Sequence, residues 1–377
     1  MKTIRILGTR GIPAAHGGFE TFAENLSRYL VKKGWQITVY CQEEGNGQRT
    51  ESDWFGIRRV HIPVRQQGAL GTIIFDWKST IHAVRESGLV LTLGYNTAVF
   101  GFLFRTKGIN NIINMDGIEW KRAKWSKPVK IWFWLNEYLG GWFGNHLIAD
   151  NPGIVHHLVR HIPHDKISMI PYGADSILQG DKKWLELHGL ESDQFVTLIA
   201  RPVPENSVLE IVRAFSKKPR KIKLVVLGEY SMSESYHRAV KENASTDVRF
   251  LGGIYEKPAI QALRYHSALY LHGHTVGGTN PSLVEAMAAG NPILAHDNQF
   301  NQWVSGPNAR YFHDEESFAI ELDKILENSE LRESMAKSSR LRHREKFTWG
   351  QVLHEYEQLL TNWQTETASS QGSYIQN

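Results

Sequence analysis

The chain has almost no cysteine, no long apolar run and little net charge. Its 377 residues include one cysteine, Cys41, which excludes a disulfide framework, and no cysteine–histidine cluster has zinc-site spacing. No apolar run approaches the roughly 20 residues that cross a bilayer. The start, residues 2–7, is too short and too charged for a signal peptide. An Asp-x-Asp metal motif is also missing, so we expect a cytoplasmic protein with no metal and no cofactor.

The composition is that of an ordinary globular protein. Apolar residues make up 41% of the chain, enough for the cores of two domains, and the net charge of +4 is compatible with anionic ligands or an anionic membrane surface. Short apolar, β-rich stretches alternate with helical periodicity in both halves. This alternation predicts an α/β protein with two Rossmann-like, doubly wound domains facing across a cleft. We place them at 1–175 and 176–346, followed by a helix at 347–363 and a disordered tail at 364–377.

The most informative stretch lies in the second half. A short apolar strand is predicted at 267–271, a glycine-containing loop follows, and a helix begins at Pro281 and ends at Gly290. A strand, a glycine loop and a helix N-terminus direct several backbone N–H groups at one point, which attracts an anion such as phosphate. Glu285 lies about one turn inside the helix, where it could accept hydrogen bonds from ribose. The alternative is an ordinary βα turn with Glu285 on a solvated face.

A second unit of this kind stands at the N-terminus. A strand at 3–7 leads into a long loop with Gly17 and Gly18, and helical periodicity then continues to Leu30. The glycine spacing is not that of the G-x-G-x-x-G dinucleotide fingerprint, which excludes an NAD-dependent oxidoreductase.

Charged residues also follow two other predicted strands. Asp116 ends a strand that starts at Ile112, with Glu119 close behind, and a carboxylate there could orient hydroxyls or accept a proton. Asp116 could instead cap the next helix. Arg201 follows a strand at 195–200, where a guanidinium can grip phosphate with two hydrogen bonds. A surface ion pair is the alternative for Arg201.

Residues 120–143 interleave cations with aromatic side chains. Tryptophan prefers the membrane interface and Lys and Arg are attracted to anionic head groups, so this segment is typical of a membrane contact or a site for a lipid-linked acceptor. The residues on which this prediction rests are Trp120, Lys121, Arg122, Lys124 and Trp125. No RNA- or DNA-binding motif accompanies them, so we expect no nucleic acid. A helix that packs its tryptophans inward remains the alternative.

The pattern Gly-Gly-x-x-Pro-Ser-Leu-x-Glu-Ala-Met-Ala-x-Gly-x-Pro-Ile resembles the nucleotide-sugar motif of retaining GT-B glycosyltransferases of the family-4 type. The variants His-x-His-x-Val-Gly-Gly-Thr-Asn-Pro-Ser and Met-Asp-Gly-x-Glu-Trp-Lys-Arg resemble a bacterial rhamnosyltransferase-like subgroup. The chain departs from the family where Gly277 replaces the first of two glutamates, where Asp116 replaces a histidine, and where Glu205-Asn206-Ser207 replaces the neighbourhood of a lysine. The resemblance covers nearly the whole chain.

The resemblance implies a role for each candidate residue and a final helix that crosses back onto the N-terminal domain. The residues that would position the sugar and acceptor are Asp116, Glu119 and His274. The residues that would bind the donor are Gly17, Gly18, Arg201, Gly277, Gly278, Thr279, Asn280 and Glu285. Arg201 and the amides at 277–278 would stabilise the departing diphosphate without a metal.

The expected activity is transfer of a sugar, rhamnose from dTDP-rhamnose in the first instance, to a lipid-linked or polysaccharide acceptor of the cell surface. The expected partners are therefore a nucleotide sugar, that acceptor and an anionic membrane surface, with the protein peripheral at the inner face of the cell membrane. Three alternatives stay open: transfer from a UDP- or GDP-sugar, a GT-B-fold sugar-nucleotide epimerase, and a non-catalytic nucleotide-sugar-binding protein.

Overall fold

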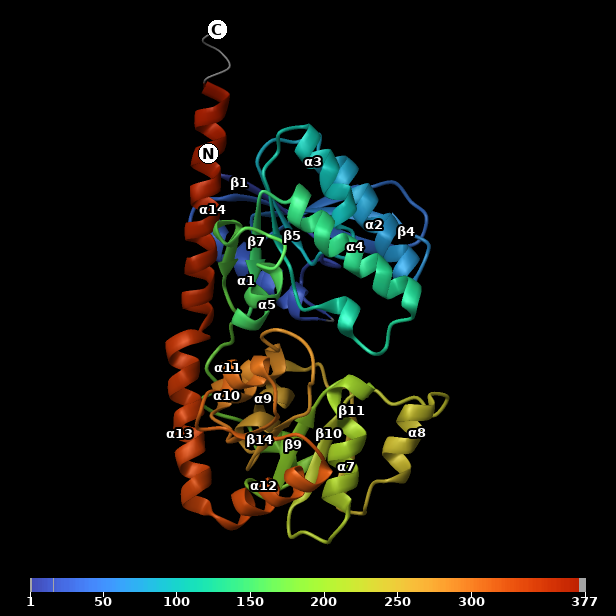
Figure 1. Cartoon of the computed structure of the whole chain (residues 1–377), viewed down its shortest axis with the longest axis vertical. Helices are drawn as coiled ribbons and strands as arrows, with labels where there is room; N and C mark the ends of the chain where they lie inside the picture. The colour runs from blue at the N-terminus through green and yellow to red at the C-terminus, as the bar shows by residue number, and fades with distance from the viewer. Residues whose placement is uncertain (1, 16, 373–377) are drawn as a thin grey trace. The chain divides into compact units, whose positions relative to one another are not determined.

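The computed structural model describes residues 2–15 and 17–372, and the side chains as far as residue 364 apart from those of the gap (Figure 1). The chain divides into two compact units. Unit 1 contains Met1–Trp120, Lys127–Pro171 and the chain from Trp349 onward, and unit 2 contains Lys121–Ser126 and Tyr172–Thr348. Each unit holds one sheet with helices around it, so the predicted α/β architecture of two doubly wound sheets is confirmed.

The sheet of unit 1 has eight strands in the order β3-β4-β2-β1-β5-β6-β7-β8. Its strands are β1 Thr3–Leu7, β2 Gln36–Glu44, β3 Thr50–Trp54, β4 Ile57–Val64, β5 Leu89–Leu93, β6 Asn111–Asn114, β7 His146–Ala149 and β8 Ile167–Met169. All neighbouring strands are parallel except β3, which pairs antiparallel with β4. The side chains of β3 are polar and it lies at the sheet edge, so it lacks the apolar signal of a buried strand.

Helices cover both faces of this sheet. They are α1 Gly18–Lys32, α2 Gly68–Ala83, α3 Phe102–Thr106, α4 Lys127–Phe143, α5 Pro152–Leu158 and α14 Trp349–Gly372. Figure 1 shows α2, α3 and α4 on one side of the strands and α1 and α14 on the other.

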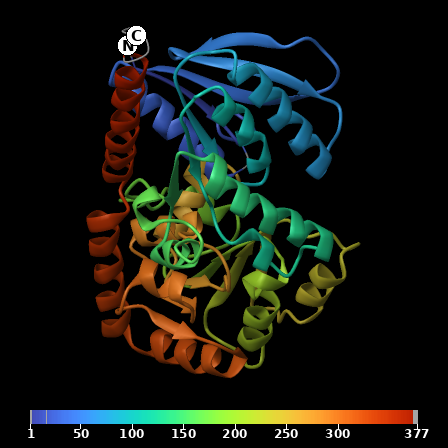
Figure 2. The same ribbon diagram turned by 45° about the horizontal axis from the view of Figure 1, so that its top comes forward.

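The last helix, α14, is part of unit 1. The ring of Tyr356 packs on Phe22 of α1 with 4.6 Å between centroids, and Thr361 accepts a 3.0 Å hydrogen bond from Lys2. Figure 2 shows α14 running beside the start of β1. The helix continues to Gly372, past residue 364, where the sequence predicted a disordered tail. Residues 373–377 of that predicted tail lie outside the described residues.

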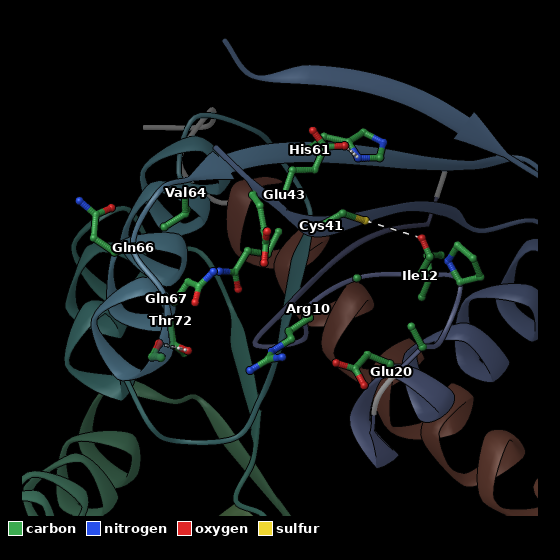
Figure 3. Close-up of a pocket in the computed structure, with 16 residues that line it drawn as sticks. Arg10, Ile12, Glu20, Cys41, Glu43, His61, Val64, Gln66, Gln67 and Thr72 are labelled. Atoms are coloured by element: carbon green, nitrogen blue, oxygen red, sulfur yellow. Dashed lines mark hydrogen bonds and ion pairs between the residues drawn. The ribbon is translucent and has the colours of Figure 1, made fainter. Parts of the chain in front are cut away.

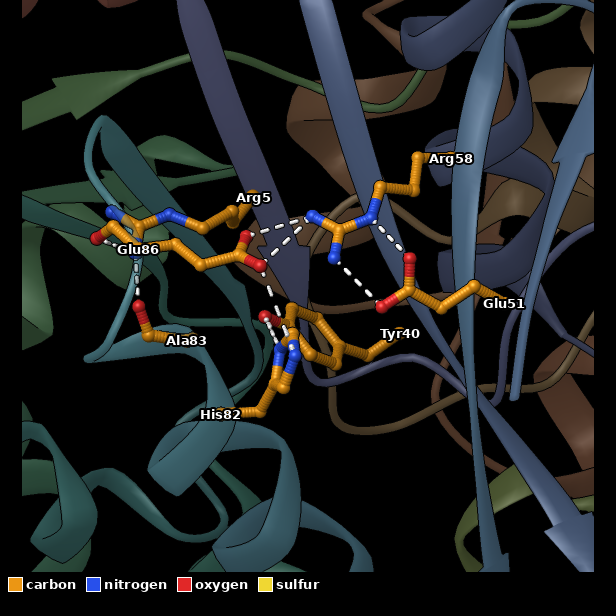
Figure 4. Close-up of polar contacts among 7 residues, drawn as sticks. All are labelled: Arg5, Tyr40, Glu51, Arg58, His82, Ala83 and Glu86. Carbon is orange, nitrogen blue, oxygen red and sulfur yellow. Dashed lines mark hydrogen bonds and ion pairs between the residues drawn. The ribbon is translucent and has the colours of Figure 1, made fainter. Parts of the chain in front are cut away.

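A paired charge network joins strands and helix in unit 1 (Figure 4). Arg58, near the start of β4, donates to Glu51 of β3 at 2.7 Å and to Glu86 at 2.8 Å, and Glu86 stands just before β5. The Tyr40 hydroxyl and the His82 ring share a 2.9 Å hydrogen bond beside it. These charges lie near the amino ends of β4 and β5 and are satisfied by one another, so this cluster holds the fold together.

The sheet of unit 2 has six parallel strands in the order β11-β10-β9-β12-β13-β14. The strands are β9 Phe195–Ile199, β10 Lys223–Leu227, β11 Val248–Gly252, β12 Tyr270–His272, β13 Ile293–His296 and β14 Arg310–Phe312. The edge strand β14 has three residues and is too short to show a pattern in the sequence. The four inner strands, β9, β10, β12 and β13, are almost entirely buried, as expected for a parallel sheet between helix layers, whereas the edge strands β11 and β14 are partly exposed.

The helices of unit 2 are α6 Lys183–Glu186, α7 Val208–Ser216, α8 Ser235–Glu242, α9 Lys257–Tyr265, α10 Pro281–Ala289, α11 Gln299–Ser305, α12 Glu315–Glu327 and α13 Ser329–Lys346. The predicted helix over 281–289 is confirmed, with Pro281 in its first turn and Gly290 in the left-handed conformation at its end. Throughout the described part of the chain, helices fall short of the length and apolarity needed to cross a membrane.

Candidate functional site

The strand order of unit 2 creates a binding position at the carboxyl ends of β9 and β12. These strands are neighbours, and the chain order reverses between them, which is where doubly wound sheets bind ligands. Thr275, after β12, donates to the carbonyl of Glu205, after β9, through its N–H at 2.9 Å and its hydroxyl at 3.0 Å. A Cβ at Gly273 would lie 2.1 Å from the Asn206 carbonyl, so only glycine allows this close approach. The two loops therefore form one structure.

Arg201 stands at the end of β9 with its side chain exposed. Within the described residues no carboxylate pairs with it, so the alternative of a surface ion pair finds no partner there. The Asn206 amide donates to the Arg201 carbonyl at 2.9 Å, which holds the turn after β9. Glu205 beside it is buried, and both its carboxylate oxygens lack a hydrogen-bond partner among the described residues. Arg201 is thus an exposed cation at a strand end that has no carboxylate partner among the described residues.

The predicted anion loop follows β12. Gly277 has φ +136°, a conformation that favours glycine, and a Cβ there would meet open space. Asn280 caps α10, because its side chain accepts a 2.9 Å hydrogen bond from the N–H of Ser282. Gly278 and the buried Thr279 complete the loop between them. The loop and the N-terminus of α10 follow β12, and Arg201 follows the parallel neighbour β9, so both lie at the same end of the sheet.

The base of this loop is held from the other side by α11. Asn298 and Asn301 donate to the carbonyl of His274 at 3.0 and 2.8 Å. The sequence indicated nothing for these two asparagines, because neither belongs to a recognisable pattern. They are positioning residues for the loop.

His274 is a neutral imidazole in this structure. Its ring stacks on the fully buried ring of His272 with 4.3 Å between centroids. Burial, and then the positive charges of Arg122 and Arg201, lower the pKa of His274 from 6.5 to about 3. A histidine with this pKa can accept or donate a hydrogen bond near neutral pH but cannot act there as an imidazolium acid. Arg122 reaches it because residues 121–126 belong to unit 2.

Glu285 lies half-buried on α10, and one of its carboxylate oxygens forms a 2.6 Å ion pair with the guanidinium of Arg264 on α9. The alternative of a solvated side chain therefore does not hold. Arg264 also approaches the Ser282 hydroxyl at 3.3 Å. Sequence analysis missed Arg264, since it is 21 residues away and follows no motif. The ion pair fixes the direction of Glu285 while its second oxygen remains available for a ligand hydroxyl.

In unit 1, Asp116 stands after β6 in a strained backbone. Its φ of +51° is uncommon for any residue but glycine, asparagine or aspartate. The Asn114 side chain accepts a 3.0 Å hydrogen bond from the Asp116 N–H and donates at 2.8 Å to the hydroxyl of Tyr356. Asp116 does not cap α4, which begins eleven residues later at Lys127. The backbone of Asp116 is held in this way, and its half-buried carboxylate is a candidate for orienting a ligand hydroxyl.

Glu119 and Trp120 are fixed inside unit 1. The buried Glu119 donates its N–H to the Tyr95 hydroxyl at 2.8 Å, and the indole of Trp120 donates to Glu137 at 2.9 Å. Glu137 of α4 is buried and also accepts from His157 at 2.8 Å. Trp120, predicted to contact the acceptor or membrane, is thus half-buried and serves to hold the loop after β6. Sequence analysis missed Glu137.

Gly17 and Gly18 lie where the loop after β1 meets α1, with Gly17 as the N-cap residue. Beside them opens a cavity of about 550 Å³ at the carboxyl ends of β1, β2 and β4 (Figure 3). Glu20 of α1 and Arg10 of the loop line it.

The described residues contain no group of three His, Cys, Asp or Glu side chains arranged to hold a metal ion.

The helix α4 presents both an inner and an outer face. Trp132 donates to the Asn96 carbonyl at 2.8 Å, as the alternative of inward packing requires. Trp134 and Trp142, however, are 45% and 69% exposed. Of the predicted contact residues, Lys121, Arg122, Lys124 and Trp125 lie before this helix, in the segment that belongs to unit 2.

Comparison with known proteins divides the chain in the same way. Residues 1–175 match a family described as Domain of unknown function (DUF1972), and residues 182–342 match Glycosyl transferases group 1. An uncharacterized glycosyltransferase of Methanocaldococcus jannaschii is 24% identical over 394 residues, covering 95% of this chain and 98% of that protein.

Solved structures share the fold at low identity. Sucrose-phosphate synthase from Thermosynechococcus elongatus superposes with a TM-score of 0.79 at 16% identity, covering 96% of this chain and 99% of that one. Anabaena HepE, solved in complex with UDP and glucose, superposes with a TM-score of 0.76 at 15% identity, covering 96% of this chain and 100% of that one. The fold is therefore GT-B. Together with the group 1 match, it supports a GT-B glycosyltransferase with a nucleotide-sugar donor.

Proposed function

We propose that this protein is a retaining, metal-independent glycosyltransferase that moves rhamnose from dTDP-rhamnose to a lipid-linked or polysaccharide acceptor in cell-surface glycan synthesis. The observation that carries the transferase proposal is the cation Arg201 beside the amide loop at 277–280, at the switch point of unit 2. Transfer breaks the bond between the sugar C1 and the diphosphate, so negative charge develops on the diphosphate. Arg201 and the loop amides stabilise that charge.

The other residues divide the remaining tasks. Glu285, aimed by Arg264, accepts hydrogen bonds from the ribose hydroxyls. The neutral ring of His274 hydrogen-bonds the sugar, and Asp116 with Glu119 orients the acceptor end. The choice of dTDP-rhamnose rests on the resemblance of the His-x-His and Met-Asp-Gly motifs to rhamnosyltransferase-like proteins.

The test is release of free nucleotide from dTDP-rhamnose, UDP-glucose and GDP-mannose, with and without a bacterial lipid-linked glycan extract and with EDTA present. Acceptor-dependent release from dTDP-rhamnose is the expected result. Acceptor-dependent release from another donor alone would replace the sugar but keep the reaction class. Conversion of the donor's sugar without acceptor would mean an epimerase, and binding without turnover a non-catalytic protein. Loss of release in EDTA would contradict metal independence.

We also propose peripheral attachment to an anionic membrane through the outer face of α4. This face carries Ile131, Trp134, Leu135 and Trp142, which are 43–69% exposed and recur at helical spacing. The acids of residues 119–143, Glu119 and Glu137, are both buried, whereas Lys127 is exposed. An apolar aromatic face with cations at its start fits an interfacial helix.

Flotation with phosphatidylglycerol vesicles checks this attachment. The double variant Trp134→Ser/Trp142→Ser should float about tenfold less than wild type, because two interfacial anchors are lost. Leu187→Ser, which changes a 70% exposed leucine of unit 2, is the matched control and should float normally. Equal flotation of the double variant and the control would contradict attachment through α4.

A further inference from the structure

The cavity of unit 1 has the shape and position of a ligand site. It lies at the carboxyl ends of β1, β2 and β4. In α/β proteins this is the edge of the sheet at which ligands bind. Its volume of about 550 Å³ is within the range of small-molecule sites. Figure 3 shows Arg10 pointing into it from the loop after β1 and Glu20 from α1.

The charges that line the cavity disfavour an anionic ligand. Three carboxylates, those of Glu20, Glu43 and Glu44, face one free guanidinium, that of Arg10. His61 also lines it, but its ring is paired with Glu43 at 2.7 Å. A phosphate here would meet more negative than positive charge at close range, which costs free energy where water is partly excluded. The net charge of the side chains that line this cavity is therefore negative, whereas the loop that carries Arg201 presents a positive charge.

The remaining polar groups are those that recognise hydroxyls. The side-chain amides of Gln42 and Gln67 can each donate and accept, carboxylates accept from hydroxyls, and Arg10 donates. Glu20 is 8% exposed, and its Oε2 atom is buried without a hydrogen-bond partner among the described residues. A buried acceptor without a partner is costly, and a hydroxyl that donates to it would remove that cost.

We infer that this cavity binds a neutral sugar residue of the acceptor, and not a sugar phosphate or the phosphate of a lipid carrier. The inference rests on the proposed glycosyltransferase function and names the chemical class of its acceptor end. Arg10 donates hydrogen bonds to ring or hydroxyl oxygens, and Glu20 accepts one from a hydroxyl. The amides of Gln42 and Gln67 form hydrogen bonds with the remaining hydroxyls. The lipid or phosphate portion of an acceptor then lies outside this cavity.

The first experiment is saturation-transfer NMR on the full chain with the methyl glycosides of rhamnose, glucose, galactose and N-acetylglucosamine, and with glucose 6-phosphate. At least one methyl glycoside should bind, and glucose 6-phosphate should neither bind nor compete. The variant Gln42→Ala/Gln67→Ala should weaken the glycoside about tenfold, since it removes two hydrogen-bonding groups. Gln261→Ala, a matched change on α9 of unit 2, should leave it unchanged.

A charge reversal makes the test sharper. Glu44 lies at the exposed end of β2, so Glu44→Lys can be made without disturbing the core. This variant should acquire measurable binding of glucose 6-phosphate. Binding of glucose 6-phosphate to the wild type in preference to every glycoside, binding of no glycoside at all, or unchanged glycoside binding in Gln42→Ala/Gln67→Ala would each overturn the inference.

Titration with dTDP and UDP separates this inference from the proposed function. Nucleotide binding without glycoside binding would overturn the neutral-sugar site and leave the transferase standing. Glycoside binding without nucleotide binding would keep a carbohydrate site and overturn the transferase.

Discussion

In unit 2 the loops at the carboxyl ends of β9 and β12 carry Arg201 and the backbone amides of 277–280. In unit 1 the corresponding edge carries carboxylates, from the end of β2, the start of α1 and the loop after β6. Both edges belong to parallel sheets of the same kind, so the sheet itself does not set the chemistry. The difference arises from a few side chains on the loops. A cationic, amide-rich edge suits a diphosphate whose charge grows during reaction, and an acidic edge suits hydroxyls.

A second contrast lies within unit 1. The charges near the amino ends of β4 and β5 are paired, as in the cluster of Arg58 with Glu51 and Glu86 (Figure 4). At the carboxyl ends, the buried Oε2 atom of Glu20 has no hydrogen-bond partner among the described residues. Polar groups that the fold does not satisfy are those a ligand can satisfy.

The largest expected effect is loss of the cation of unit 2. Arg201→Ala should lower transfer by about 100-fold or more, because a charge that stabilises the leaving diphosphate is removed. Isothermal titration with dTDP and UDP and the rate of nucleotide release measure the loss. Arg249→Ala, at another exposed arginine of the same unit, is the matched control and should match wild type. If both variants bound nucleotide equally well, Arg201 would not be part of the diphosphate site.

In unit 1, Asp116→Gly should separate chemistry from folding. Transfer should fall at least about tenfold, because the carboxylate that orients the acceptor is lost. Glycine adopts a φ of +51° without strain, so the free energy of unfolding should change by no more than about 1 kcal/mol. Thermal unfolding and nucleotide release measure the two quantities. Full transfer in Asp116→Gly would exclude a role for this carboxylate.

The pH dependence of stability tests the environment of His274. Its folded pKa of about 3 lies below the unfolded value of 6.5, so the unfolded chain binds more protons between these values. The contribution of neutral His274 to the free energy of unfolding is therefore fully present above about pH 6.5 and is lost as the pH falls toward 3. At pH 5 this single group should cost about 2 kcal/mol relative to pH 8.

Urea unfolding of wild type and His274→Gln at pH 8 and pH 5 measures this contribution, because the other titrating groups cancel in the difference. The variant should lose less stability than wild type on acidification. Equal losses would mean that His274 is solvated enough to be protonated in the folded protein.

The smallest effect concerns the backbone of the amide loop. Gly277→Ala meets no neighbouring atom but must adopt a φ of +136°, so it should weaken dTDP binding about fivefold through backbone strain of about 1 kcal/mol. Gly350→Ala also meets open space and has no positive φ, and it should bind dTDP normally. Undiminished affinity in Gly277→Ala would show that the loop amides do not need this conformation.

Sequence alone determined the alternation of strands and helices, and with it the doubly wound fold, because apolar periodicity is a local property of the chain. It also determined both ends of α10, where proline favours the first turn and glycine tolerates the left-handed end. Residues that follow β9 and β12, such as Arg201 and Gly277, could be predicted to lie at one edge of the sheet, since the carboxyl ends of its parallel strands share that edge.

Only the tertiary structure decided which partners these residues have. Arg264 aims Glu285, Glu137 holds Trp120, and Arg122 joins unit 2 beside His274, although each pair is separated by many residues and follows no motif. Burial and charge contacts of this kind depend on the packing of whole elements. Three features are for that reason properties of the folded protein and not of any stretch of its sequence. They are the pKa of His274, the inward direction of Trp120 and the negative charge of the cavity beside Glu20.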